Sequence, residues 1–211
     1  MKNKKTMLFG IAGTGIFIIW TFLIKTIDVR KIGPKGSEVG FASLNGFFHN
    51  ITGVNFGLYD LTDWLGLVPV CFMFGFSFLG LVQLLKRKNL LKVDNDILIL
   101  GGFYLVLAAV YLFFEKFVIN YRPVLINGIL EASYPSSTTL LTLCVMPSSA
   151  ILLDRRIKEP KLRKAAVYII GIFTVFMVFA RLVSGVHWIT DIIGGIFLSI
   201  GLVFVYYSLT E

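Results

Sequence analysis

The stretch EASYPSSTTLLTLCVMPSSAILL, residues 131–153, joins a run of hydroxyl side chains to a long apolar segment. A proline and four consecutive hydroxyl residues precede the apolar run at 140–153: Pro135, Ser136, Ser137, Thr138 and Thr139. One Ser or Thr is enough to cap a helix, because a cap satisfies only one or two free backbone N–H groups. The pattern therefore predicts a buried helix whose first turn has a second role beside capping.

The composition is that of a membrane protein. Of the 211 residues, 56% are hydrophobic and only 15% are charged, and the mean hydropathy is +0.82. A bilayer core is about 30 Å thick and is crossed by roughly 20 apolar helical residues. Six segments approach that length: residues 7–24, 65–85, 97–114, 140–153, 165–183 and 188–207. We therefore predict an all-α polytopic protein, with six transmembrane helices in a single domain over residues 1–211. The fourth segment is short unless its hydroxylated start lies at membrane depth.

The first segment resembles a signal peptide, since lysines precede it, but no A-x-A cleavage signal follows. We interpret it as a retained anchor. Cys71 and Cys144 lie inside predicted spans, where a thiol behaves as a small hydrophobic group. The sequence thus predicts no disulfide framework, no metal site and no cofactor.

The net charge of +8 is spread over the loops and forms no continuous patch, which argues against nucleic-acid binding. If the N-terminus lies inside, the inner segments hold thirteen of the twenty basic residues: Lys2, Lys4, Lys5, Lys86, Arg87, Lys88, Lys92, Arg155, Arg156, Lys158, Lys161, Arg163 and Lys164. Cytoplasmic loops are enriched in Lys and Arg. We therefore predict a multi-pass protein of the cell membrane with both termini in the cytoplasm. The sequence predicts no oligomeric state.

The outer connection at 33–63 contains apolar residues at helical spacing: Phe41, Leu44, Phe47, Phe48 and Ile51. This spacing predicts an amphipathic helix in the headgroup layer, or alternatively a lid over a lipid site.

Three basic residues lie at outward-facing helix ends, against the charge bias: Lys116, Arg122 and Arg181. They belong to EKFVINYRP (115–123) and RLVSGVHWITD (181–191), which the predicted topology places on the same side as YPSSTT (134–139). A phosphoryl group is stabilised by fixed cations, hydroxyl donors and helix N-termini. These segments supply all three, with Ser136 and Ser137 beside the cations, and they predict an oxyanion site. Simple helix capping remains the alternative for the hydroxyl run.

His187 and Asp191 stand four residues apart at the start of the last span, and so share one helical face. The carboxylate can then accept a proton from one imidazole nitrogen and leave the other free as a nucleophile. A structural histidine at the membrane interface is the alternative.

These residues resemble the three signatures of the type 2 phosphatidic acid phosphatase superfamily: a Lys…Arg-Pro stretch, a Pro-Ser-Gly-His stretch and an Arg-x5-His-x3-Asp stretch. Arg181, His187 and Asp191 match the third spacing throughout. The resemblance implies six spans, an active site on the outer face and a metal-independent hydrolysis through a phosphohistidine on His187. It also implies that Asp191 orients that histidine, while Lys116, Arg122 and Arg181 hold the phosphoryl oxygens.

The chain departs from these signatures at three positions. Lys116 has five residues before Arg122 where the family has six, and Glu115 occupies the strict position. One residue rotates a helix by about 100°, so Lys116 reaches the site only if the helix bends or unwinds. Ala180 replaces the leading serine of the third signature, and Thr138 replaces the histidine of the second.

In the family that histidine protonates the leaving oxygen, which threonine cannot do near neutral pH. Loss of general-acid help slows departure of an alkoxide by about 10²- to 10⁴-fold, whereas a phosphate leaving group needs less help. Thr138 therefore indicates a diphosphate substrate, an acid from elsewhere, or a site that binds without efficient turnover. The other outer groups that could serve as the acid are His49, Asp60, Asp63 and Glu131.

The sequence thus predicts a membrane lipid phosphatase acting on a lipid phosphomonoester or an isoprenoid diphosphate, with the diphosphate ahead because of Thr138. A non-catalytic protein that binds or transports phospholipids is the alternative from a different class. Phosphoryl transfer to an acceptor other than water is a third possibility.

Overall fold

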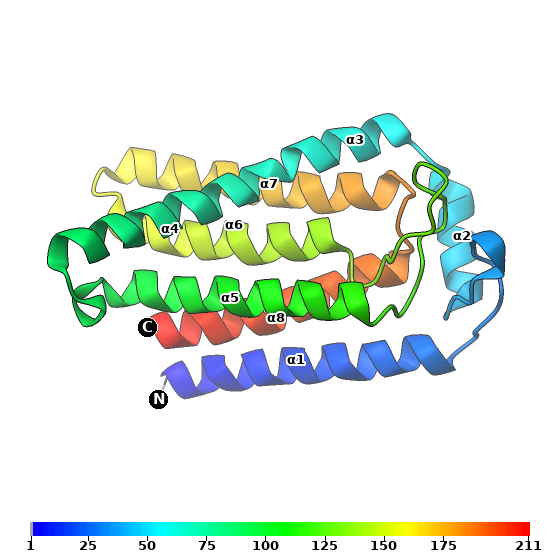
Figure 1. Ribbon diagram of the computed structural model, residues 1–211, viewed down its shortest axis with the longest axis horizontal. Helices are drawn as coiled ribbons and strands as arrows, with labels where there is room; N and C mark the ends of the chain where they lie inside the picture. Colours follow the sequence, from blue (N-terminus) through cyan, green and yellow to red (C-terminus); the bar gives the residue numbers. More distant parts are fainter. Residues whose placement is uncertain (1) are drawn as a thin grey trace.

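The apolar stretches form long helices in the computed structural model, which describes residues 2–211 (Figure 1). The described helices are α1 (Lys2–Thr26), α2 (Ala42–Thr52), α3 (Phe56–Leu65), α4 (Leu67–Arg87), α5 (Asn95–Lys116), α6 (Ser137–Arg156), α7 (Pro160–Val183) and α8 (Ile189–Thr210), with 3₁₀ turns η1 (Pro34–Gly36) and η2 (Leu90–Lys92). Six helical segments are long and apolar enough to span a membrane, and α3 and α4 together form the second of them. The predicted all-α, six-span architecture is confirmed.

All six spans are longer than the apolar segments that predicted them, and the extensions of two spans concern the site. α6 begins at Ser137, so Ser137, Thr138 and Thr139 form its first turn rather than a loop before it. The second span runs over 32 residues, from Phe56 to Arg87. At 1.5 Å per residue this is about 48 Å, well beyond a bilayer core of about 30 Å. α3 is therefore the part that projects past the span, and it carries its side chains over one end of the bundle.

Figure 1 shows both termini at one end of the bundle, with α2, α3 and the α5–α6 connection at the other. We call these the terminus end and the loop end. The amphipathic helix predicted around residues 41–51 is present as α2, at the loop end.

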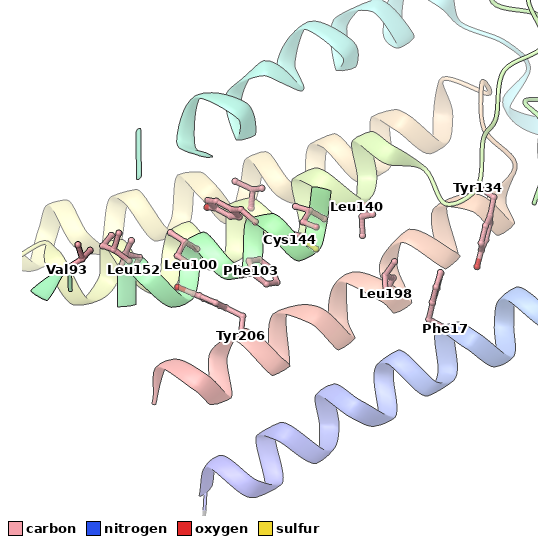
Figure 2. Close-up of a cluster of buried hydrophobic side chains, with 14 of the residues drawn as sticks. Phe17, Val93, Leu100, Phe103, Tyr134, Leu140, Cys144, Leu152, Leu198 and Tyr206 are labelled. Carbon is pink, nitrogen blue, oxygen red and sulfur yellow. The ribbon is translucent and has the colours of Figure 1, made fainter. Parts of the chain in front are cut away.

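α6 is the most enclosed span, with half of its most apolar window buried, whereas only 6% of the window in the second span is buried. The buried cluster in Figure 2 joins α6 to its neighbours through Leu140, Cys144 and Leu152. Towards the loop end, the rings of Phe17 on α1 and Tyr134 stack with centroids 6.0 Å apart. The segment that enters α6 is thereby fixed against α1 before the first turn of α6 begins.

Glycines allow two of the helices to approach closely. A side chain on Gly13 of α1 would lie 3.0 Å from the Cα of Gly201 on α8, and one on Gly201 would lie 2.7 Å from the backbone of Thr14. Small residues let membrane helices pack backbone against backbone. α1, the predicted anchor, is therefore packed into the helix bundle.

Candidate active site

The connection between α5 and α6 folds back on itself and brings the predicted motifs together at the loop end. The backbone N–H of Arg122 donates to the carbonyl of Glu131 (3.0 Å), and that of Ser133 donates to the carbonyl of Asn120 (2.9 Å). The N–H of Ser136 reaches the carbonyl of Asp191 at the start of α8 (3.2 Å). These backbone hydrogen bonds hold the segment around Arg122 against the segment that enters α6, and hold the latter against the start of α8.

His187 is buried, with 4% of its surface exposed, and both ring nitrogens have neighbours. Nδ1 lies 3.2 Å from the carbonyl oxygen of Ser133, which can only accept, so Nδ1 carries the proton. Nε2 is then the nitrogen with the free lone pair, and Nη1 of Arg122 donates to it at 3.1 Å. The tautomer that a nucleophilic Nε2 requires is therefore the one that the structure stabilises.

Asp191 acts on His187 less directly than the sequence predicted. Its carboxylate lies 3.8 Å from Nδ1 of His187, longer than a hydrogen bond. It instead accepts from the backbone N–H of Trp188 (3.0 Å) and from the side-chain amide of Asn120 (3.1 Å). Asp191 therefore holds the start of α8 and the first motif in place, while the carbonyl of Ser133 orients the imidazole.

Arg122 and Arg181 are both buried, at 7% and 1% exposure, and they lie on the same aromatic ring. The guanidinium carbon of Arg122 is 5.8 Å from the centroid of Tyr59, and that of Arg181 is 4.7 Å from it. A flat aromatic face attracts guanidinium groups. Tyr59, on the projecting helix α3, thus keeps two like charges close together.

Each arginine also has a carboxylate neighbour. Nε of Arg122 forms an ion pair with Glu131 at 3.0 Å. Arg181 donates to the hydroxyl of Thr62 (3.1 Å) and lies 3.8 Å from the carboxylate of Asp63. The acids balance the two charges while leaving guanidinium N–H groups for an anion, as the unpaired Nε of Arg181 illustrates.

The hydroxyl run at the start of α6 divides into different roles. Ser136 is fully buried at the N-cap position, but its side chain does not cap the helix and instead accepts from the hydroxyl of Thr139 at 3.0 Å. Ser137 lines both of the cavities described next, and Thr138 lines the larger one. The first-turn N–H groups of α6 have no acceptor within the helix, and they give this end a partial positive charge.

Two cavities meet at Ser137. The larger, which we call the groove, has a volume of about 520 Å³ and runs between α4, α5 and α6; apolar residues such as Leu107 and Phe74 line most of it, with Ser137, Thr138 and Asp63 at one end. The smaller, which we call the hollow, has a volume of about 20 Å³ and is lined by His187, Ser137 and Glu115, among others. The hollow has room for roughly one water.

Lys116 does not join this arrangement. α5 remains helical up to Lys116, whose exposed amine lies over the ring of Phe117, 6.0 Å from its centroid. The neighbouring Glu115 faces the hollow instead. The helix ends without the bend that would turn this side chain inward, so Lys116 lines neither the hollow nor the groove, and its contact with a phosphoryl oxygen stays a prediction.

The burial of His187 and the two cations near it lower its pKa well below the usual value; burial is the largest cause, followed by Arg122 and Arg181. The imidazole is thus neutral near pH 7, as a nucleophile must be. Within residues 2–211, the structure shows no group of three His, Cys, Asp or Glu side chains placed to hold a metal ion.

Sequence reasoning did not single out four residues that the structure places at the site: Tyr59, Thr62, Asn120 and Ser133. Tyr59 and Thr62 lie more than 100 positions from Arg181 in the chain. Periodicity carries no signal for such contacts, and Ser133 acts through its backbone carbonyl, which is independent of its side chain.

Comparisons with known proteins found a similar fold and a family. A solved structure described as the first transmembrane PAP2-type phosphatidylglycerolphosphate phosphatase from Bacillus subtilis is similar in fold, with a TM-score of 0.61 and 19% identity over 95% of this chain and 94% of that one. No curated protein matches the chain. A family model described as the PAP2 superfamily matches residues 67–211, which include both site arginines, the start of α6, His187 and Asp191. The chain is a polytopic membrane protein that belongs to the PAP2 superfamily.

Proposed function

We propose that this protein is a membrane lipid phosphatase that hydrolyses a lipid phosphomonoester or an isoprenoid diphosphate through a phosphohistidine on His187. The observation that carries this proposal is the contact between Arg122 and Nε2 of His187, at 3.1 Å. It supports a buried site in which the nucleophile is in direct contact with a cation that can bind a phosphoryl group.

The proposed reaction begins when the phosphoryl group of the lipid binds the two guanidinium groups and the N-terminus of α6. The anion draws Arg122 away from Nε2, because a charge-assisted bond to phosphate is stronger than one to a neutral imidazole. Nε2 then attacks phosphorus, the leaving oxygen departs on the opposite side, and water later cleaves the phosphorus–nitrogen bond. The chain's own guanidinium groups supply the positive charge that the transition state needs, so the proposed reaction is metal-independent.

The groove supports a lipid as the substrate. It is lined mostly by apolar side chains and ends at the polar first turn of α6, so a lipid tail in it would place its phosphate beside Ser137. The similar Bacillus subtilis protein is described as a phosphatidylglycerolphosphate phosphatase, which agrees with a lipid phosphomonoester. Thr138 favours an isoprenoid diphosphate, whose phosphate leaving group departs with less help from an acid.

The charge distribution supports the outer side of the cell membrane as the location of the site. The predicted inner loops, which are rich in Lys and Arg, belong to the terminus end. The positive-inside rule then places both termini in the cytoplasm and the loop end outside.

A second function, binding or transport of phosphorylated lipids without hydrolysis, is favoured by Thr138 alone. The two functions differ in the fate of the phosphate. A phosphatase forms an acid-labile phosphohistidine and releases inorganic phosphate, whereas a binding protein retains the intact lipid.

The test is replacement of His187 by Asn and by Ala, with His49→Asn as the matched control because His49 packs on Trp188 outside both cavities. Release of inorganic phosphate from phosphatidic acid and from an isoprenoid diphosphate should fall at least about 10³-fold in both His187 variants, because the nucleophile is lost. The control should retain activity. Unchanged release by His187→Ala would refute the assignment of the nucleophile.

A further inference from the structure

The source of the proton for the leaving oxygen is the part of the proposed reaction that the three motifs do not supply. Thr138 stands where the family motif has its histidine, and a threonine hydroxyl does not release a proton near neutral pH. The proton must therefore come from a group on another segment, within reach of the oxygen that leaves phosphorus.

The two cavities define the side on which that oxygen lies. In phosphoryl transfer the attacking and leaving atoms are roughly in line, on opposite sides of phosphorus. His187 lines the hollow, Thr138 lines the groove, and Ser137 lines both. A phosphoryl group at Ser137 with His187 behind it therefore directs its leaving oxygen, and the lipid attached to it, towards the groove.

Among the residues described, Asp63 is the acidic side chain that lines the groove, at the same end as Ser137 and Thr138. Its carboxylate lies 3.8 Å from Nη2 of Arg181. With 62% of the side chain exposed, it can exchange protons with water. Asp63 thus contacts a cation that can bind the phosphoryl group, lies on the side of the leaving group, and is open to solvent.

The other candidate acids lie elsewhere. Glu115 lines the hollow, on the side of the nucleophile. Glu131 forms an ion pair with Arg122. His49 packs against Trp188, with ring centroids 5.5 Å apart. Asp60 lies one helical turn from Asp63, outside the groove and the hollow.

We propose that Asp63 is the proton carrier of the reaction and takes the part of the missing histidine. In the first step the Asp63 carboxyl gives its proton to the leaving oxygen, while the phosphorus–oxygen bond breaks and the bond from Nε2 to phosphorus forms. In the second step the Asp63 carboxylate takes a proton from the water that attacks phosphorus, the phosphorus–nitrogen bond breaks, and phosphate departs. The imidazole and the carboxyl group are then as they were at the start.

This inference rests on the proposed function and widens its substrate range, because a lipid phosphomonoester with an alkoxide leaving group then has a proton donor.

The test compares Asp63→Asn with Asp60→Asn, which removes a carboxylate from the same helix outside both cavities. Two substrates are used: phosphatidic acid, whose leaving alkoxide needs a proton, and p-nitrophenyl phosphate, whose leaving phenolate does not. In single turnovers, Asp63→Asn should slow leaving-group release from phosphatidic acid by about 10²- to 10⁴-fold and change that from p-nitrophenyl phosphate little. Acid-labile phosphoenzyme should then accumulate with p-nitrophenyl phosphate, because water is no longer activated. Asp63→Glu should restore part of the rate.

Other outcomes overturn the inference. An equal loss with both substrates means that Asp63 only positions Arg181. A rate for Asp63→Asn equal to that of Asp60→Asn on phosphatidic acid removes any role in proton transfer. If the wild-type protein releases no leaving group from either substrate and forms no phosphohistidine, the proposed function itself fails. The wild-type control thus separates that failure from failure of the proton carrier alone.

Discussion

At the scale of the residue, the site depends on how one imidazole is held. His187 donates from Nδ1 to the carbonyl of Ser133 and accepts at Nε2 from Arg122. A backbone carbonyl cannot take a proton from the ring near neutral pH, so this contact fixes the tautomer without competing for the proton. The carboxylate of Asp191 is then free to hold the backbone of Trp188 and the amide of Asn120.

The lowered pKa of His187 predicts how activity depends on pH. Acid would inactivate the proposed nucleophile by protonating Nε2, and a pKa below the ordinary value keeps the ring neutral to lower pH. The acid limb of kcat/KM, which reports the free enzyme, should therefore lie below about pH 6.5, the ordinary value for histidine. A pH profile with p-nitrophenyl phosphate measures it. A limb at or above that value would contradict the burial of a neutral imidazole between two cations.

At the scale of the element, packing of α1 against α8 holds in place the segments that carry the site. The indole of Trp20 on α1 donates to the carbonyl of Thr190 on α8 at 3.2 Å, next to Asp191. The hydroxyl of Thr21 lies 2.7 Å from that of Tyr134, in the segment that enters α6. α1 therefore contributes to the geometry of the site although the family match begins only at residue 67.

The glycine contact between these helices gives a second prediction. Gly201→Leu places a side chain against the backbone of Thr14, where even a Cβ would lie only 2.7 Å away, so the two helices must separate. Overpacking of this kind costs about 1–3 kcal/mol or more. We expect a lower midpoint of thermal unfolding in detergent and weaker phosphatase activity. Gly15→Leu is the control, since a Cβ there meets nothing within 4 Å. Equal stability of the two variants would show that α1 is not part of the packed bundle.

At the scale of the whole molecule, charge and shape together define a direction across the membrane. The site lies at the loop end, and most of the basic loop residues belong to the terminus end. α3, the loop-end part of the 32-residue second span, adds a layer of structure beside Arg181.

Cysteine labelling in intact cells tests the direction. In a Cys71→Ala background, with the buried Cys144 retained, Lys31→Cys at the loop end should react with a membrane-impermeant maleimide. Lys92→Cys at the terminus end should react only after the membrane is permeabilised. The reverse pattern would place the site in the cytoplasm and contradict the positive-inside assignment.

The sequence by itself determined the six spans and the identity of the nucleophile candidate. Hydropathy is a property of consecutive residues, so a bilayer selects the same apolar segments whatever their partners. The four-residue spacing of His187 and Asp191 is also local, and the structure keeps both residues at the start of α8. The same holds for the hydroxyl run, which is the first turn of α6.

Only the tertiary structure decided which side chains lie around His187 and the two buried arginines. Lys116 and Glu115 are neighbours in sequence, and the end of α5 turns the acid rather than the base towards His187. Tyr59, Thr62 and Asp63 reach Arg181 because α3 continues beyond the membrane span. The physical reason is that a bilayer selects an apolar segment by its hydropathy, whichever way its side chains are turned about the helix axis. Binding of an anion, by contrast, requires groups from distant segments at fixed distances. Those distances exist only after the helices have packed.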